Sequence, residues 1–235
     1  MTVDTSPLDD GATYRIKDVL RLLKSAERRF SPVALASSMG AEDMVLIDIV
    51  ARNDLSIGVF VLDTGRLHSE TYGLIQEIRA HYELPIKVFS PTHAALEQFM
   101  AAHGPNGFYD SIEARKACCA IRKVEPLGRA LAGYGSWVTG MRREQSITRA
   151  ELALEEWDGR NGLQKFNPLA DWSSDDVWTY IRANEVPYNP LHDSGFPSIG
   201  CAPCTRAVAP GDDPRSGRWW WEDAEERECG LHVKD

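Results

Sequence analysis

Five cysteines are the residues of this chain whose type and spacing point most directly to chemistry. Cys118 and Cys119 are adjacent in "KACCAIRK", and Cys201 and Cys204 form a Cys-x-x-Cys pair in "GCAPC". Four thiolates in two pairs are a ligand set that suits either zinc or an iron–sulfur cluster. Cys229, in "ECGLH" close to the C-terminus, is left over.

The adjacent pair distinguishes between the two kinds of metal site. A zinc site needs sulfurs that converge on one ion at about 2.3 Å, and neighbouring cysteines do this poorly. A cubane cluster offers separate iron corners, so two neighbouring residues on a helix can each reach a different iron. The spacing therefore favours an iron–sulfur cluster over zinc, and over a buried structural pair of thiols.

The fifth cysteine has no pairing partner if the other four hold a cluster. A lone thiol near a chain end is often inert, but Cys229 lies in a charged segment, "EDAEERECGLHVKD", that we expect to be mobile. Glu228 disfavours the reactive thiolate, whereas His232, Lys234 and nearby arginines favour it. A nucleophilic role requires this tail to dock against the arginine-rich loops "MRREQSITR" and "TRAVAPGDDPRSGR".

Composition limits the classes of protein to consider. The chain has 235 residues, of which 43% are hydrophobic and 26% charged, so we expect one large domain or one domain with an appendage. A net charge of −9 argues against binding nucleic acid by bulk electrostatics. The sequence has neither a secretory signal nor an apolar run long enough to span a bilayer, so a cytoplasmic location and no membrane partner are expected. Cytoplasmic thiols stay reduced, which favours metal or redox chemistry for the cysteines.

Alternating strand and helix patterns predict the elements that position these residues. Helices are expected at 13–30, 41–53, 69–82, 92–104, 111–131 and within 171–186, and strands at 32–38, 57–65, 86–91 and 136–141. Ser173 and Asp176 form a candidate capping box. This alternation predicts an α/β fold with a mostly parallel, doubly wound sheet. After Pro187 the pattern gives way to a long segment rich in Gly and Pro.

Two strand ends are candidates for a nucleotide crevice, because open α/β sheets bind ligands beyond the carboxyl ends of their strands. In "SSMGAED" (37–43), the small residues Ser37, Ser38, Gly40 and Ala41 let backbone amides approach a phosphate or sulfate. The acids that follow, Glu42 and Asp43, repel such an anion unless they face away or bind ribose hydroxyls. An ordinary turn with a helix cap is the alternative interpretation.

The second strand end is "LDTG" (62–65). Asp63 is placed to accept a hydrogen bond from a hydroxyl or an exocyclic amine, and Gly65 permits a close backbone approach. A plain turn is again the alternative. Together, on successive strands, the two loops favour a nucleotide crevice.

The motifs taken together resemble the adenylyl-sulfate reductase branch of the phosphoadenylyl-sulfate reductase family, from about residue 30 to the end. The motifs that carry the resemblance are "SSMGAED", "LDTG", "KACCAIRKVEPL", "TGMRREQSITR", "GCAPCTRAVAPGDDPRSGRWWWE" and "ECGLH". The resemblance implies a doubly wound, mostly parallel α/β sheet of the adenine-nucleotide α-hydrolase type with a mobile C-terminal segment. We expect residues 1–210 to form the nucleotide-binding reductase domain and residues 211–235 the tail.

The resemblance also implies the chemistry. Cys118, Cys119, Cys201 and Cys204 would ligate one 4Fe–4S cluster. Cys229 would attack the sulfur of adenosine 5′-phosphosulfate, expel AMP and become S-sulfonated, and thioredoxin or a similar dithiol would then release sulfite. The implied substrate-binding residues are Ser37, Ser38, Gly40, Ala41, Glu42, Asp43, Leu62, Asp63, Thr64, Gly65, Lys123, Gly140, Arg149, Arg215, Arg218 and His232.

The implied cations fit the chemistry of the step. Negative charge grows on the leaving phosphate as the S–O bond breaks, and one fixed donor aimed there is typically worth about 3 kcal/mol. The same cations lower the pKa of an attacking thiol. One departure from the family pattern is Met39, where the loop often has a small polar residue. If its side chain faced the nucleotide, binding there would be in doubt.

Three other interpretations compete with this one. A 3′-phosphoadenylyl-sulfate reductase differs only in substrate. A pyrophosphatase-type thiolation enzyme needs a Ser-Gly-Gly-x-Asp-Ser loop, and "SSMGAED" lacks the paired glycines and the closing serine. An iron–sulfur sensor would leave Cys229 and the arginine loops without a role. We expect a homo-oligomer, and we expect the tryptophans of "RWWWE" (218–222) to pack the root of the tail rather than stack on adenine.

Overall fold

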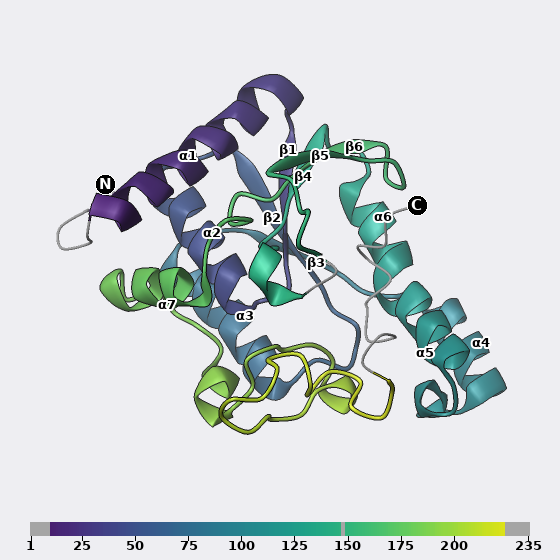
Figure 1. Ribbon diagram of the computed structural model, residues 1–235. Helices are drawn as coiled ribbons and strands as arrows, with labels where there is room; N and C mark the ends of the chain where they lie inside the picture. Colours follow the sequence, from purple (N-terminus) through teal and green to yellow (C-terminus); the bar gives the residue numbers. More distant parts are fainter. Residues whose placement is uncertain (1–9, 147–148, 224–235) are drawn as a thin grey trace. The chain divides into compact units, whose positions relative to one another are not determined.

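The computed structural model describes residues 10–146 and 149–223 (Figure 1). The chain forms two compact units, one from residues 1–61, 70–87 and 133–190, the other from residues 62–69, 88–132 and 191–235. Residues 224–235 lie outside the described residues. They include the expected nucleophile Cys229, His232 and most of the tail that we expect to be mobile. The domain boundary expected at residue 210 stays a prediction.

A six-stranded sheet organises the first unit, with strand order β3-β2-β1-β4-β6-β5. The strands are β1 (Val33–Ser37), β2 (Ile57–Leu62), β3 (Ile86–Phe89), β4 (Ser136–Val138), β5 (Glu155–Asp158) and β6 (Leu163–Phe166). β1 pairs in parallel with β2 and β4, β4 pairs in parallel with β6, and β5 pairs antiparallel with β6. The predicted α/β fold with a mostly parallel sheet is confirmed.

The helices of the first unit agree with the sequence prediction to within a few residues. They are α1 (Asp10–Phe30), α2 (Ala41–Arg52), α3 (Ser69–His81) and α7 (Ser174–Ala183). The predicted capping box begins α7, because Ser173 Oγ accepts from Asp176 N at 3.0 Å and an Asp176 carboxylate oxygen accepts from Ser173 N at 2.8 Å. These reciprocal bonds satisfy two amides that a helix start leaves without partners.

Helix α2 is buried along most of its length and carries one charged group into the core. Asp48 is fully buried, and its carboxylate accepts hydrogen bonds from Tyr82 Oη, Tyr180 Oη and Arg52 Nε, each at 2.7 Å. Three hydrogen bonds offset the free-energy penalty of burying this carboxylate, and they hold its partners in fixed positions. Helix α2, which begins directly after the loop at 38–40, is thereby fixed against α7.

The second unit contains α4 (His93–His103), α5 (Ile112–Cys119) and α6 (Glu125–Leu131). The sequence predicts one helix over 111–131, but a π-helical turn, Ala120–Val124, separates α5 from α6. π turns of this kind occur mostly as single insertions within α-helices, often at functional sites. The double cysteine ends α5, so this turn follows it directly.

Strands expected from sequence are shorter in the structure, and β3, for example, ends at Phe89. β2 ends at Leu62 rather than Gly65, because the Asp63 carboxylate accepts a hydrogen bond from Gly65 N at 2.8 Å and turns the chain. β4 ends at Val138 rather than Met141. The β5–β6 hairpin, by contrast, is not predicted. In the part of the chain that the structure describes, no helix is both long and apolar enough to cross a membrane.

Candidate active site

The first unit has a topological switch point between β1 and β4. These neighbouring parallel strands continue in opposite directions across the sheet, β1 toward β2 and β4 toward β6. The loops that follow them, at 38–40 and 139–146, therefore lie at the carboxyl edge, where open α/β sheets usually bind their ligands. Both loops carry residues that the sequence assigns to substrate binding.

The first of these loops is closed by its own side chains. Ser38 donates to an Asp43 carboxylate oxygen twice, from its amide at 2.6 Å and from Oγ at 2.8 Å. Met39 N donates to Ser37 Oγ at 3.1 Å. Burial raises the pKa of Asp43 to about 6, although the bonds from Ser38 act to lower it. Asp43 is thus turned back into its own loop and does not extend toward a ribose.

Met39 does not face the crevice. Its side chain is fully buried within the hydrophobic core, and its backbone has a left-handed φ of 63°. A non-glycine residue rarely adopts this conformation unless the surrounding structure holds it. The whole residue is buried, so the departure from the family pattern does not put a methionine side chain against a nucleotide.

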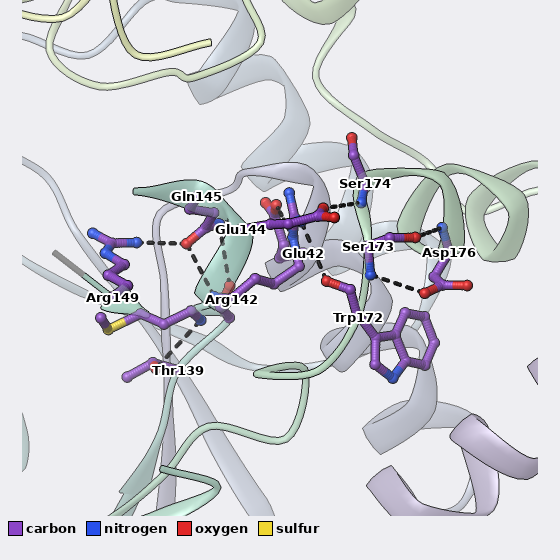
Figure 2. Close-up of polar contacts among 12 residues, drawn as sticks. Glu42, Thr139, Arg142, Glu144, Gln145, Arg149, Trp172, Ser173, Ser174 and Asp176 are labelled. Atoms are coloured by element: carbon purple, nitrogen blue, oxygen red, sulfur yellow. Dashed lines mark hydrogen bonds and ion pairs between the residues drawn. The ribbon is translucent and has the colours of Figure 1, made fainter. Parts of the chain in front are cut away.

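The second loop contributes a buried arginine that sequence reasoning did not single out (Figure 2). Arg142 is 7% exposed, and its Nε donates to Glu42 Oε1 at 2.8 Å. Its Nη1 donates to Glu144 Oε2 at 3.2 Å and to Trp172 O at 3.3 Å. Glu42, expected at the substrate, is therefore engaged in an ion pair that joins the loop after β4 to the start of α2.

Gly140 is needed for the close approach of these two segments. A Cβ at this position would collide with Asp43 Oδ1 and would lie 2.9 Å from Glu42 Cβ. Arg149, expected near the phosphosulfate, is half-buried at the end of the same segment, and its Nη1 donates to Gln145 Oε1. The structure thus brings Gly140 and the loop at 37–43 together, and places Arg149 beside Gln145 (Figure 2).

In the second unit, the loop "LDTG" contacts the cysteine-containing segments. Thr64 is 1% exposed, and its Oγ1 lies 3.2 Å from Cys201 Sγ within hydrogen-bonding distance. Thr64 O accepts from Arg122 Nη1 at 2.6 Å. Gly65 has a φ of 67°, which favours glycine. A loop assigned by sequence to the nucleotide is therefore in direct contact with one of the expected cluster ligands.

The four expected ligands line one pocket of the second unit. Cys118, Cys119, Cys201 and Cys204 are free thiols, and all four line one partly open pocket. The cations that also line this cavity are Arg66, Arg115, Arg122 and Lys123. Among the described residues, no group of three or more His, Cys, Asp or Glu side chains is placed to hold a single metal ion.

Burial makes two of these thiols, Cys118 and Cys204, hard to ionise without compensating positive charge. Burial raises the pKa of Cys204 to about 12, and Cys201 adds to this effect, whereas Lys123 and Arg218 act to lower it. Burial likewise raises the pKa of Cys118, opposed by Arg122. A bound metal reverses this balance, because a coordinating thiol is deprotonated outright. The donor set and its cationic surroundings therefore fit a thiolate-ligated metal group.

Two of the expected sulfate-binding cations lie near this pocket. Lys123 lines the pocket from the π turn, and Arg218 acts electrostatically on Cys204. Arg218 Nη1 donates to Ser198 Oγ at 3.3 Å, and its guanidinium lies 4.7 Å from the centre of the Trp219 ring. Arg215 lies in the same loop and is half-buried. His232 is outside the described residues.

The segment after Arg218 is anchored by a buried ion pair that the sequence does not reveal. Arg115 Nε and Nη2 donate to the two carboxylate oxygens of Glu222, both at 2.8 Å, and the side chains are 1% and 3% exposed. Arg115 also interacts with Cys119, and Trp219 N donates to Cys204 O at 3.2 Å. The segment at 219–222 is thus attached to both cysteine pairs.

The tryptophans pack in this same segment. Trp219 is buried, and Trp221 lies against Tyr109 with ring centres 4.5 Å apart. Trp220 contacts Trp221 at 4.8 Å between ring centres. The structure agrees with the prediction that "RWWWE" packs the root of the C-terminal segment.

Breaking the buried pair is expected to destabilise the protein strongly. An Arg115→Met substitution leaves the Glu222 carboxylate buried without its partner, so we expect a loss of about 3–5 kcal/mol in the free energy of unfolding. The double variant Arg115→Met/Glu222→Met should recover most of this loss, because well-packed apolar residues replace a buried pair at little cost. Urea unfolding followed by circular dichroism measures both. A double variant no more stable than the single one would contradict this account.

Comparison with known proteins gives the family. The model of the phosphoadenosine phosphosulfate reductase domain matches residues 32–207. The chain belongs to this family. It is 52% identical over 235 residues to the adenosine 5′-phosphosulfate reductase of Allochromatium vinosum, covering 100% of this chain and 90% of that protein. It is 51% identical over 232 residues to the enzyme of the same name from Burkholderia cepacia, covering 99% and 93%.

Solved structures agree with this membership. The phosphoadenylyl-sulfate reductase of Candida auris, solved as a phosphate complex, superposes with a TM-score of 0.70 at 25% identity, covering 88% of this chain and 100% of that one. The FMN adenylyltransferase of Candida glabrata, in complex with FAD and inorganic pyrophosphate, shares the fold with a TM-score of 0.59 at 15% identity, covering 99% and 81%. The predicted family and the nucleotide-binding α/β fold are confirmed, whereas the individual site residues stay predictions.

Proposed function

We propose that this member of the phosphoadenosine phosphosulfate reductase family reduces adenosine 5′-phosphosulfate to sulfite and AMP in sulfate assimilation. It is an oxidoreductase that acts on a sulfur group. The relatives named adenosine 5′-phosphosulfate reductase, matched over nearly their whole length, support this substrate. The observation that carries the proposal in the structure is the pocket in which four free thiols and four cations meet.

We assign this pocket to one 4Fe–4S cluster held by Cys118, Cys119, Cys201 and Cys204. Four thiols, positive surroundings and two adjacent ligands support a cluster with separated iron corners rather than a single ion. When bound, the cluster supplies a fixed charge and a cross-link between the two cysteine pairs. The electrons for the reaction come from outside, since Cys229 already offers a covalent route.

The chain's own residues carry the chemical steps. The Cys229 thiolate attacks the sulfur of adenosine 5′-phosphosulfate, a new S–S bond forms, and the S–O bond to the phosphate breaks. AMP leaves with the electron pair of that bond, and Cys229 becomes an S-sulfocysteine. Lys123, Arg149, Arg215, Arg218 and His232 are assigned to the phosphosulfate, where positive charge stabilises the developing phosphate anion.

An external dithiol completes the cycle. One of its thiolates attacks the Cys229 sulfur, and sulfite leaves with the electron pair of the S–S bond. The second thiol of the donor then resolves the mixed disulfide, so the donor loses two electrons and Cys229 returns to a thiol. Thioredoxin or a similar protein is the proposed donor. The four free cysteines fit a reducing compartment, so the cytoplasm is the proposed location, and a homo-oligomer stays a prediction.

Turnover on the two candidate nucleotides tests the substrate assignment. With a dithiol donor in excess, we expect sulfite release from adenosine 5′-phosphosulfate with a kcat/KM at least 100-fold above that for the 3′-phosphorylated nucleotide. The same preparation should show no release of pyrophosphate from ATP. Preference for the 3′-phosphorylated substrate would assign the chain to the other branch of the family. Pyrophosphate release without sulfite formation would overturn the proposal.

A further inference from the structure

The cations that line the cysteine pocket differ in how their charge is balanced. Arg115 donates to both oxygens of the buried Glu222 carboxylate, so this pair is neutral as a unit. Arg66 is bonded instead to two uncharged groups, because its Nη1 donates to Asn106 Oδ1 at 3.0 Å and its Nη2 donates to Pro105 O. Among the described residues Arg66 has no carboxylate partner, so it brings a full positive charge to the pocket.

Contacts on both sides of the pocket fix the position of Arg66. Its backbone oxygen accepts from Ala202 N at 2.8 Å, within the loop that joins Cys201 to Cys204. Its guanidinium lies 5.1 Å from the centre of the Phe108 ring, which precedes the helix that ends in the double cysteine. The residue is half-buried. Arg66 therefore connects the loop after β2 with segments that adjoin both cysteine pairs.

We propose that Arg66 is a positioning residue for the cluster, which supplies an unbalanced positive charge to the thiolate site and holds the ligand loop at 201–204. Four ligating thiolates carry four negative charges, and the iron core offsets only part of them. Burying the remaining charge is costly unless cations lie nearby. The inference rests on the proposed function, because that proposal places the cluster in this pocket.

The charge of Arg66 already acts on one of the expected ligands. Burial raises the pKa of the Cys118 thiol, and the positive charges of Arg122 and Arg66 act to lower it. The interaction therefore favours the thiolate, which is the form that binds metal. Arg122 Nη1 donates to Thr64 O, and Arg66 N donates to Thr64 Oγ1 at 3.2 Å, so one residue of the loop after β2 is bonded to both arginines.

Substitutions at this position separate the charge from the hydrogen bonds. Arg66→Lys keeps the charge but loses the planar fork that reaches Asn106 and Pro105 together. Arg66→Gln keeps a polar side chain without the charge, and Arg66→Met has neither. A nearby positive charge makes it easier to add an electron to a cluster, so its removal lowers the reduction potential. Loss of the hydrogen bonds loosens the ligand loop, so iron leaves faster.

Iron release and the reduction potential of the anaerobically prepared, cluster-loaded protein test the proposal. Arg66→Met should release iron to a chelator at least tenfold faster than the wild type, and its cluster should be reduced at a lower potential. Arg66→Gln should lower the potential as well. Arg66→Lys should restore the wild-type potential and release iron at an intermediate rate. Arg129→Met is the matched control, since the charge of Arg129 is balanced by Glu125 at the surface, and it should change neither quantity.

The outcomes separate this inference from the proposed function. Wild-type protein that holds no iron would remove the cluster, and this inference with it. In protein that holds iron, an Arg66→Met variant with the wild-type rate of iron release and the wild-type potential would overturn only the role of Arg66. An equal shift of the potential in Arg66→Lys and Arg66→Met would exclude the charge as its cause and overturn the proposal. Circular dichroism checks the fold, and Arg66→Gln decides the question if Arg66→Met does not fold.

Discussion

A Cys229→Ser variant is expected to lose sulfite formation by at least about a thousandfold, because serine is a far weaker nucleophile than a thiolate at neutral pH. Mass spectrometry of the intact wild-type protein, mixed with adenosine 5′-phosphosulfate in the absence of a dithiol, should detect one added sulfonate group. The variant should show none. The measurement thus follows the covalent intermediate itself and does not depend on the second half of the cycle.

The control for this variant is its iron content. Cys229 is not one of the four proposed cluster ligands, so Cys229→Ser should keep the iron and the visible absorbance of the wild type. A variant that keeps turnover would remove the nucleophile from the mechanism. A sulfonate adduct that persists in Cys229→Ser would assign the nucleophile to another thiol.

The second large effect is expected at the cluster ligands. Cys118→Ser should reduce bound iron to less than about a tenth of the wild-type value and lower kcat at least 100-fold, since metal affinity depends on the complete ligand set. Iron and acid-labile sulfide analysis of anaerobically purified protein measures the first effect, and sulfite release measures the second. Cys229→Ser is the matched control for iron content, because it makes the same atomic change at a cysteine that is not a proposed ligand.

The outcomes for Cys118→Ser show whether Cys118 is a cluster ligand and whether turnover requires the cluster. Full iron content in this variant would exclude Cys118 as a ligand. Loss of iron with unchanged turnover would show that the reaction does not need the cluster. Burial raises the pKa of Cys204 to about 12, which is why the metal is needed to keep this thiol ionised. Without metal, the Cys204 thiol stays protonated at neutral pH and carries no charge that would attract the guanidinium groups around it.

Much of the fold could be predicted from sequence because its central elements have unambiguous patterns. The apolar runs before "SSMGAED" and "LDTG" are buried strands, and the capping box at Ser173 and Asp176 is present. The β5–β6 hairpin was missed because β5 reads Glu-Glu-Trp-Asp, and such charges are depleted in strands. Tertiary partners compensate, since Arg29 pairs with Glu155 and Lys165 with Glu156.

Sequence reveals candidate site residues where the pattern is local, and it does not reveal contacts between residues that are distant in the chain. Adjacent cysteines and a Cys-x-x-Cys pair are visible in sequence, and the four do line one pocket. The sequence does not reveal the direction of the Asp43 side chain, nor the ion pairs of Arg142 with Glu42 and of Arg115 with Glu222. Each of these contacts depends on tertiary structure, which decides which side chains lie next to one another. Within "MRREQSITR", nothing in the sequence separates a buried arginine from an exposed one.

The π-helical turn at Ala120–Val124 determines the direction of the cationic side chains that it contains. Such a turn accommodates one surplus residue in an otherwise regular spiral, and one residue of an α-helix corresponds to a rotation of about 100°. Arg122 and Lys123 therefore point elsewhere than an uninterrupted spiral starting at Cys118 would aim them. A chain shortened by one residue here would stay helical but would misdirect both cations, so the length of this turn, and not only its residue types, sets where the two positive charges lie.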